Sequence, residues 1–230
     1  MATAIISRRV LAGSAIVNSE FETGMLGLRV LGSGKEYAMT CGHVVAPRPA
    51  KATTAEPITS EGRPLGPVVT WSPFGPGYNT TDAALIDPGF GTVVSNEKLN
   101  LGPAPGYVED ISAFLATPGQ DMKVEIHSSR VSAGPILGEI DDVYIESDNK
   151  KFGFDSTGKN EFFFAPILGY HAGVDVGDSG SAVVHTQSRK VLGIHFAVDE
   201  PNGTGYGMGY CILFPYILAA FQDYQLTISP

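Results

Sequence analysis

The sequence predicts an all-β protein in which many short strands form a barrel or a sandwich. Glycine (28 residues) and proline (16 residues) are both frequent among the 230 residues, as expected where tight turns join short strands. β-Rich or alternating runs recur along the whole chain, and turn-forming residues separate them. Charged residues make up 17% and apolar residues 43% of the chain, which argues against disorder and supplies enough apolar side chains for a core.

The expected strands are short, and turn signals such as Asp87-Pro88-Gly89 separate them. The N-terminal run after Arg8 and Arg9 is interpreted as an ordinary first strand and not as an export signal, because its apolar stretch is short and no convincing cleavage site follows. The runs predicted to form strands are 15–17, 26–31, 36–41, 67–71, 83–86, 122–128, 135–140, 143–146, 162–168, 181–185, 191–197 and 206–213.

The sequence predicts a division into two domains and one C-terminal helix. A segment that begins with Gly and Pro residues, 105–120, is expected to be a linker between an N-terminal β-domain, 1–104, and a C-terminal β-domain, 121–230. A helix is predicted over 215–226, where Pro215 suits the first turn and apolar residues recur on one face.

Charge and cysteine content narrow the possible partners. The chain has 24 acidic and 15 basic residues, a net charge of −9, so we expect no nucleic-acid partner. No apolar run reaches the length of about 18 residues that a membrane span needs, so no membrane partner is expected. Cys41 and Cys211 both lie in apolar sequence and are predicted to be buried free thiols. This favours a cytoplasmic location, with secretion as the alternative.

The most specific motif is Gly177-Asp178-Ser179-Gly180. Glycines beside a serine let the backbone curl so that neighbouring N–H groups point into one space, where they can hold a developing oxyanion. The serine hydroxyl is then free to attack a carbonyl carbon. The structural alternative is a plain Gly-Ser turn between two strands.

A nucleophilic serine needs a base, and the base needs an orienting acid. His43 ends a β-rich run, and Asp82 opens the apolar run 83–86. Alone, each residue type at such a position is more often structural. Their combination with Ser179 predicts a catalytic triad of His43, Asp82 and Ser179.

With this order of motifs, Thr40-Cys41-Gly42-His43, Asp82-Ala83-Ala84-Leu85 and Gly177-Asp178-Ser179-Gly180, the chain resembles the trypsin/chymotrypsin-like serine peptidases. Its pattern is most similar to the compact bacterial-type and V8-like (glutamyl endopeptidase-like) members. The resemblance implies two six-stranded antiparallel β-barrels with a C-terminal helix and the active site between the barrels. It also implies an oxyanion hole from the N–H groups of Gly177 and Ser179, with no metal and no cofactor.

Two departures from the animal digestive enzymes are visible. The cysteine that usually follows the catalytic histidine is Val44, so that disulfide is absent. No Ile-Val-Gly-Gly segment is present that could activate a zymogen by pairing with Asp178. The enzyme is therefore expected not to be a zymogen of that type, and Asp178 must find another partner.

The resemblance also suggests a pocket for the substrate residue that precedes the cleaved bond. Its floor falls on Gly173, with Asp175 close by, so a preference for Lys or Arg loses its usual basis. The segment around His195 is similar to the pocket wall of V8-like enzymes, where a histidine helps hold a glutamate carboxylate. The alternative is that His195 is a core histidine on an inner strand.

The favoured hypothesis is thus a serine endopeptidase that acts on protein or peptide substrates, with a regulatory protein as a possible further partner. The alternative is a catalytically silent or partner-activated binding module with the same fold. A catalytic zinc is not expected, because the histidines include no His-Glu-x-x-His motif.

Overall fold

Strands dominate the structure, which confirms the all-β prediction. The computed structural model describes residues 7–18, 23–46, 58–73, 75–132, 134–144, 151–152, 162–199 and 207–229. The elements of the first half are β1 (Arg8–Leu11), β2 (Ala15–Val17), β3 (Thr23–Met25), β4 (Leu28–Gly32), β5 (Lys35–Thr40), α1 (Gly42–Val45), β6 (Ile58–Ser60), β7 (Arg63–Gly66), β8 (Val68–Trp71), β9 (Gly77–Asn79), β10 (Ala84–Ile86), β11 (Thr92–Ser95) and the 3₁₀ helix η1 (Glu97–Leu99).

The second half begins with a short helix and closes on a strand that returns to the first half. Its elements are α2 (Ile111–Leu115), β12 (Lys123–His127), β13 (Ile136–Tyr144), β14 (Lys151–Phe152), β15 (Phe162–Phe164), β16 (Ile167–Ala172), β17 (Ala182–His185), β18 (Val191–Val198), β19 (Gly207–Leu213), α3 (Phe214–Ala220), the 3₁₀ helix η2 (Gln222–Tyr224) and β20 (Thr227–Ile228).

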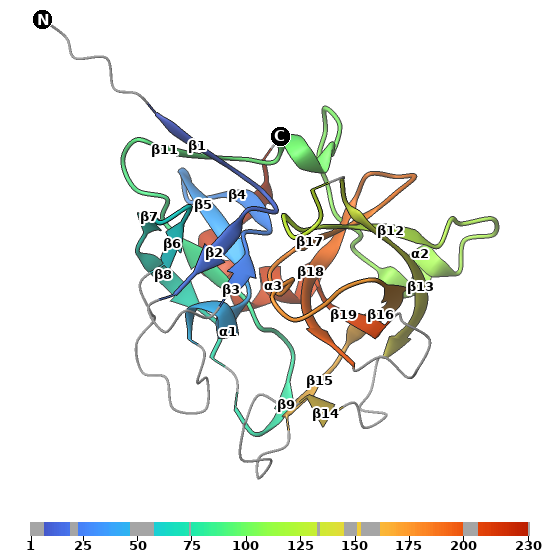
Figure 1. The fold of residues 1–230 in the computed structure, drawn as a ribbon. Helices are drawn as coiled ribbons and strands as arrows, with labels where there is room; N and C mark the ends of the chain where they lie inside the picture. The colour runs from blue at the N-terminus through green and yellow to red at the C-terminus, as the bar shows by residue number, and fades with distance from the viewer. Residues whose placement is uncertain are drawn as a thin grey trace, which may run out of the picture.

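The second half is a closed six-stranded antiparallel barrel with the order β12-β13-β16-β19-β18-β17. Strand β18 is buried along most of its length, as a strand covered on both faces should be. The barrel interior holds its own apolar cluster, which includes Val124, Leu168, Val183 and Leu192. In Figure 1 this barrel carries the yellow-to-red ribbon on the right.

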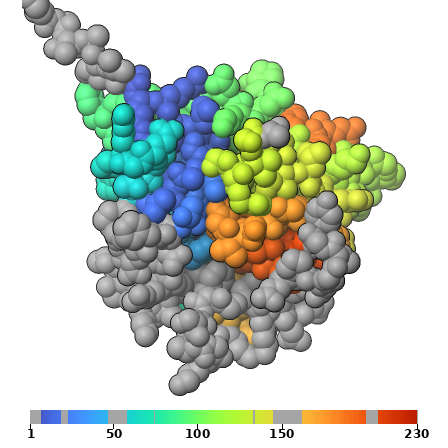
Figure 2. Space-filling model, in the orientation of Figure 1, coloured from blue at the N-terminus to red at the C-terminus, as the bar shows by residue number. Residues whose placement is uncertain are grey.

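The first half forms a five-stranded sheet, β20-β4-β5-β10-β8, and a four-stranded sheet, β3-β2-β6-β7. A further parallel pair joins β1 to β11. The larger apolar cluster of the molecule draws residues from both halves, among them Leu28, Leu85, Ile194 and Phe214. The two halves therefore share a core, and Figure 2 shows them packed side by side.

Two short pairings cross between the halves. Strand β20, from the C-terminus, pairs with β4 of the first half, and β9 of the first half pairs in parallel with β15 of the second. In the residues that the structure describes, no helix is long and apolar enough to span a membrane.

Several local predictions can be compared with the observed elements. The runs 135–140 and 143–146 were expected as separate strands but fall on one strand, β13, which ends at Tyr144 and has an irregularity between Ile140 and Asp142; residues 145 and 146 lie outside the described residues. The run 162–168 is two strands, β15 and β16, which meet at Ala165-Pro166. The C-terminal helical region comprises α3 and η2, and α2 lies inside the proposed linker 105–120. Cys41 and Cys211 are both buried and free, as predicted.

Candidate active site

His43 and Asp82 come together because their strands are neighbours. His43 lies in α1, directly after β5, and Asp82 precedes β10, which pairs with β5 in a register that sets Ala84 opposite Thr40. The Nδ1 atom of His43 lies 2.5 Å from Oδ2 of Asp82. The backbone N–H of His43 donates to the other carboxylate oxygen at 2.9 Å. Asp82 is completely buried and His43 is partly exposed.

This geometry determines which ring nitrogen can act as a base. A carboxylate facing Nδ1 holds the proton on that nitrogen and leaves Nε2 as the acceptor. Gly42 makes the close approach possible, because a Cβ atom at this position would lie 2.8 Å from Oδ1 of Asp82. The residue before His43 therefore has to be small.

Ser179 lies in the turn that leads into β17. Its Oγ donates to the carbonyl oxygen of Phe196 in β18 at 3.2 Å, and its own carbonyl accepts the N–H of Met25 at 2.7 Å. Gly180 has a positive φ of 96°. A Cβ atom there would lie 2.2 Å from the carbonyl oxygen of Met25 and 2.4 Å from Oγ1 of Thr40, so glycine is required on both counts. The turn that carries Ser179 thus packs tightly against the first half.

The turn that carries Ser179 and the histidine–aspartate pair lie at the same junction between the halves. The carbonyl oxygen of His195 accepts the N–H of Gly180 at 2.7 Å and the thiol of Cys41 at 3.2 Å. A Cβ atom on Gly24 would touch both the side chain of Val44 and the carbonyl oxygen of Ser179. Residues beside His43 and residues of the turn that carries Ser179 therefore share the same neighbours, His195 and Gly24.

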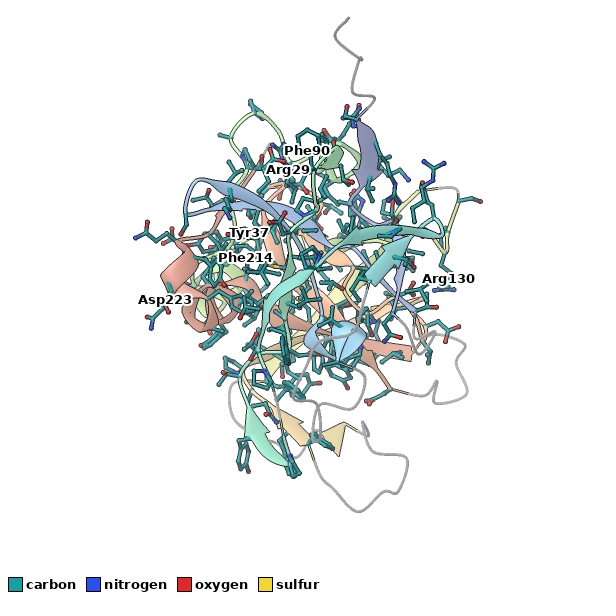
Figure 3. The ribbon with its side chains drawn as sticks, turned by 90° about the vertical axis from the view of Figure 1, so that its left-hand side faces the viewer. Arg29, Tyr37, Phe90, Arg130, Phe214 and Asp223 are labelled. Atoms are coloured by element: carbon teal, nitrogen blue, oxygen red, sulfur yellow. The ribbon has the colours of Figure 1, made fainter. Side chains whose placement is uncertain are left out.

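Asp178 has found its partners within the second half. Its buried carboxylate accepts hydrogen bonds from Nε of Arg130 (3.1 Å to each oxygen), from Nη2 of Arg130 (2.8 Å), from the hydroxyl of Ser128 (2.5 Å) and from the backbone N–H of Asp175 (2.9 Å). Burial would raise the pKa of Asp178, but the hydrogen bonds from Arg130 and Ser128 outweigh it and lower the pKa. Arg130 lies at the surface in Figure 3.

The predicted pocket residues Gly173 and Asp175 lie on the same turn, and both are exposed. The carbonyl oxygen of Gly173 accepts a hydrogen bond from Nη2 of Arg130 at 2.7 Å, so one guanidinium holds both ends of the segment that leads to the serine. The carboxylate of Asp175 accepts the N–H of Val176 at 2.8 Å. Gly177 has a positive φ of 96°, which glycine adopts freely.

His195 is buried, with 1% of its surface exposed. Its Nδ1 lies 2.6 Å from the hydroxyl of Tyr170, and its ring also makes a hydrogen bond to the backbone of Tyr210. Burial, opposed in part by Asp178, lowers the pKa of His195 from 6.5 to about 4. Burial also raises the pKa of Tyr170 well above 10. The imidazole is therefore neutral at pH 7 and accepts the phenolic proton at Nδ1.

Among the described residues, the single group that could hold a metal ion is Cys41, His43 and Asp82, whose donor atoms lie within 4.8 Å of one another. Burial, and then the charge of Asp82, raise the pKa of the Cys41 thiol well above 9.0. The protonated thiol donates to the carbonyl oxygen of His195, and His43 and Asp82 are hydrogen-bonded to each other, so all three side chains have partners within the protein.

Sequence reasoning missed Arg130, Ser128 and Tyr170. The motif around Ser179 signalled that Asp178 needed a partner, but nothing near it in the sequence names a residue 48 positions away. Tyr170 lies outside the predicted runs 162–168 and 181–185, and no signal in the sequence marked it as a partner of His195.

The fold is that of chymotrypsin-like serine proteases. A glutamic-acid-specific serine protease, whose structure is described as using a novel histidine triad in substrate binding, superposes with a TM-score of 0.64 at 20% identity, over 96% of this chain and 100% of that one. Nocardiopsis protease gives 0.62 at 14% identity, over 96% and 100% of the two chains. Thermobifida fusca protease A gives 0.61 at 15%, over 96% and 98%. No protein-family model and no curated protein sequence matches the chain.

Proposed function

We propose that the chain is a serine endopeptidase that cleaves proteins or peptides through an acyl-enzyme. The observation that carries the proposal is the pair of His43 and Asp82 at the junction where the turn of Ser179 docks. Ser179 Oγ attacks the scissile carbonyl carbon while Nε2 of His43 takes the hydroxyl proton and returns it to the leaving amine. Water then attacks the ester carbonyl of the acyl-enzyme, His43 again takes and returns the proton, and the carboxylic acid product and free Ser179 are released. Asp82 holds the imidazole in the required tautomer and stabilises its charged form.

The oxyanion hole is proposed to be the N–H groups of Gly177 and Ser179. The carboxylate of Asp178 stabilises this turn by accepting hydrogen bonds from Arg130, from Ser128 and from the N–H of Asp175. Because these partners all belong to the folded chain, the turn does not need a newly cut N-terminus to form. The full-length protein is therefore proposed to be active without clipping.

Substrate is proposed to bind as an added strand along the end of β18. The pairing of β18 with β17 ends at Ile194, and Ser179 Oγ contacts the carbonyl oxygen of Phe196 two residues further on. Beyond it, Ala197 and Val198 are partly exposed. An extended peptide can add its main-chain hydrogen bonds to such an edge and bring one carbonyl to the serine.

The residue preferred before the cleaved bond stays a prediction. In the glutamic-acid-specific relative in fold, a histidine triad binds substrate; here the ring of His195 is engaged with Tyr170 and with the backbone of Tyr210. These partners favour the core-histidine alternative over a direct contact with glutamate. Otherwise identical peptides with Glu, Lys, Leu or Ala at that position, tested on the parent and on His195→Ala, decide between the two.

A fluorophosphonate probe tests the enzyme hypothesis directly. The probe forms a covalent bond with an activated serine, so we expect labelling of the parent and none of Ser179→Ala. A folded parent that remains unlabelled would favour the silent binding module. Labelling that starts when a partner protein is added would favour partner activation.

A further inference from the structure

The thiol of Cys41 crosses the junction between the two halves. Cys41 directly follows β5 and lies two residues before His43, and its Sγ donates to the carbonyl oxygen of His195, 154 positions away, at 3.2 Å. The side chain is completely buried. Its sulfur also lies within 4.8 Å of the donor atoms of His43 and Asp82. This side chain thus bonds to the second half and lies close to the histidine–aspartate pair.

The acceptor of that thiol is shared with the turn that carries Ser179. The same carbonyl oxygen of His195 accepts the backbone N–H of Gly180, the residue after Ser179, at 2.7 Å. A carbonyl oxygen has two lone pairs and can accept both bonds at once. One atom of β18 therefore joins the segment that carries the base to the segment that carries the nucleophile.

The neighbouring contacts show why the segments at this junction cannot shift freely relative to each other. The backbone of Gly180 packs against Thr40 Oγ1 and against the carbonyl oxygen of Met25, so closely that no Cβ atom fits. Thr40 in turn donates to that carbonyl of Met25 at 2.8 Å. A small shift of the segment around Cys41 would be transmitted to the distance between the imidazole and the serine hydroxyl.

We propose that Cys41 is a positioning residue of the active site: its thiol, through the carbonyl of His195, sets His43 in register with Ser179. The proposal rests on the peptidase function proposed above. Burial keeps the thiol protonated, so it acts as a donor and not as a nucleophile. A displacement of about 1 Å between reacting groups can cost two orders of magnitude in rate, so even a weak S–H···O bond can affect catalysis.

Cys211 provides the matched control. It is also a completely buried free cysteine, but its Sγ contacts the carbonyl oxygen of Ile212 at 3.4 Å, inside the second barrel. Cys211 pairs with His195 in the β18–β19 register, but its side chain belongs to the apolar cluster of the barrel and its thiol makes its bond to Ile212, so Cys211→Ala removes the same sulfur atom and leaves both hydrogen bonds to the carbonyl of His195 in place. The loss of stability should be similar in both alanine variants, whereas the effect on catalysis should differ.

The experiment compares Cys41→Ala, Cys41→Ser and Cys211→Ala by peptide hydrolysis, by the rate of fluorophosphonate labelling and by the pH dependence of kcat. Cys41→Ala should lower kcat and the labelling rate about tenfold with KM changed less than about twofold. Cys41→Ser, which keeps a donor, should recover most of the loss. Cys211→Ala should stay within about twofold of the parent. Equal effects of Cys41→Ala and Cys211→Ala, or no recovery with serine, would overturn the proposal.

A measurement that needs no activity completes the test. The amide proton of Gly180 shares its acceptor with the thiol, so its chemical shift and exchange rate should change in Cys41→Ala and not in Cys211→Ala. An unchanged Gly180 amide refutes the proposal even if the parent is not labelled, and absence of labelling refutes the peptidase function separately. If Cys41→Ala does not fold, Cys41→Val, which fills the space without a donor, takes its place.

Discussion

Removal of Arg130 should weaken the active site more than it weakens the fold. In Arg130→Met the carboxylate of Asp178 stays completely buried but loses the guanidinium, and it keeps only the donors from Ser128 and Asp175. Breaking a fully buried ion pair costs about 3–5 kcal/mol. The side chain of Arg130 is 37% exposed, so solvent screens part of the pair and we expect about 2 kcal/mol.

The lost ion pair destabilises the turn that carries Ser179. If the whole of about 2 kcal/mol destabilises the formed turn relative to other conformations of it, the fraction of molecules with a correctly formed turn falls by up to about 30-fold. The rate of labelling by a fluorophosphonate should fall by a similar factor, measured at pH 7 under pseudo-first-order conditions. Arg130→Lys keeps the charge but not the planar fork, and its labelling rate should lie between those of the parent and Arg130→Met.

Arg189 is the control, because it makes an equally close pair with Glu125, at 2.8 and 3.0 Å, away from the turn. Arg189→Met should affect stability but leave labelling within about threefold of the parent. The pH dependence gives a second readout. Arg130 lowers the pKa of Asp178, so its stabilisation is present above the ordinary pKa of the carboxyl and is lost as the pH falls through the lowered pKa; in Arg130→Met the pKa is less depressed, so this acid-dependent loss of stability should be smaller than in the parent. Equal labelling of the two methionine variants would refute the reasoning.

The remaining predictions concern the triad and His195. Ser179→Ala and His43→Ala should lose nearly all peptidase activity while they keep the fold, and activity within about tenfold of the parent would contradict the assignment. Asp82→Asn should cost somewhat less, mainly through the wrong tautomer of His43, and its circular dichroism should match the parent. The unfolded chain protonates His195 near pH 6.5, whereas the folded chain does so at about 4, so stability should fall by about 3 kcal/mol as the pH drops through this window. Urea unfolding of His195→Gln should lack that component, and an identical pH profile would count against a buried neutral histidine. Fresh full-length protein should react with the probe without a lag, and strict dependence on N-terminal clipping would contradict the role given to Asp178.

Local sequence was enough for the fold class and for naming the candidate site residues. Alternating apolar residues and turn signals report directly on strands, because the side chains of a strand alternate between its two faces. The motif around Ser179 identified a curled turn because glycine alone tolerates the positive φ found at Gly177 and Gly180. The pairing of His43 with Asp82 was also predicted, on the basis of family resemblance, and the register of β5 and β10 places them in contact.

The residues that support the site from distant positions could be identified from the folded chain and not from local sequence. Arg130 and Ser128 reach Asp178 because β12 and its following turn pack beside β17. Tyr170 reaches His195 across the barrel, and Cys41 reaches the carbonyl of His195 across the junction. Strand β20 joins the sheet of the other half through β4. Such contacts depend on how whole strands pair and pack, and the periodicity of a single segment carries no information about which partner it will meet. Local patterns thus predicted the longer strands and the candidate reactive groups, and packing determined what holds those groups in place.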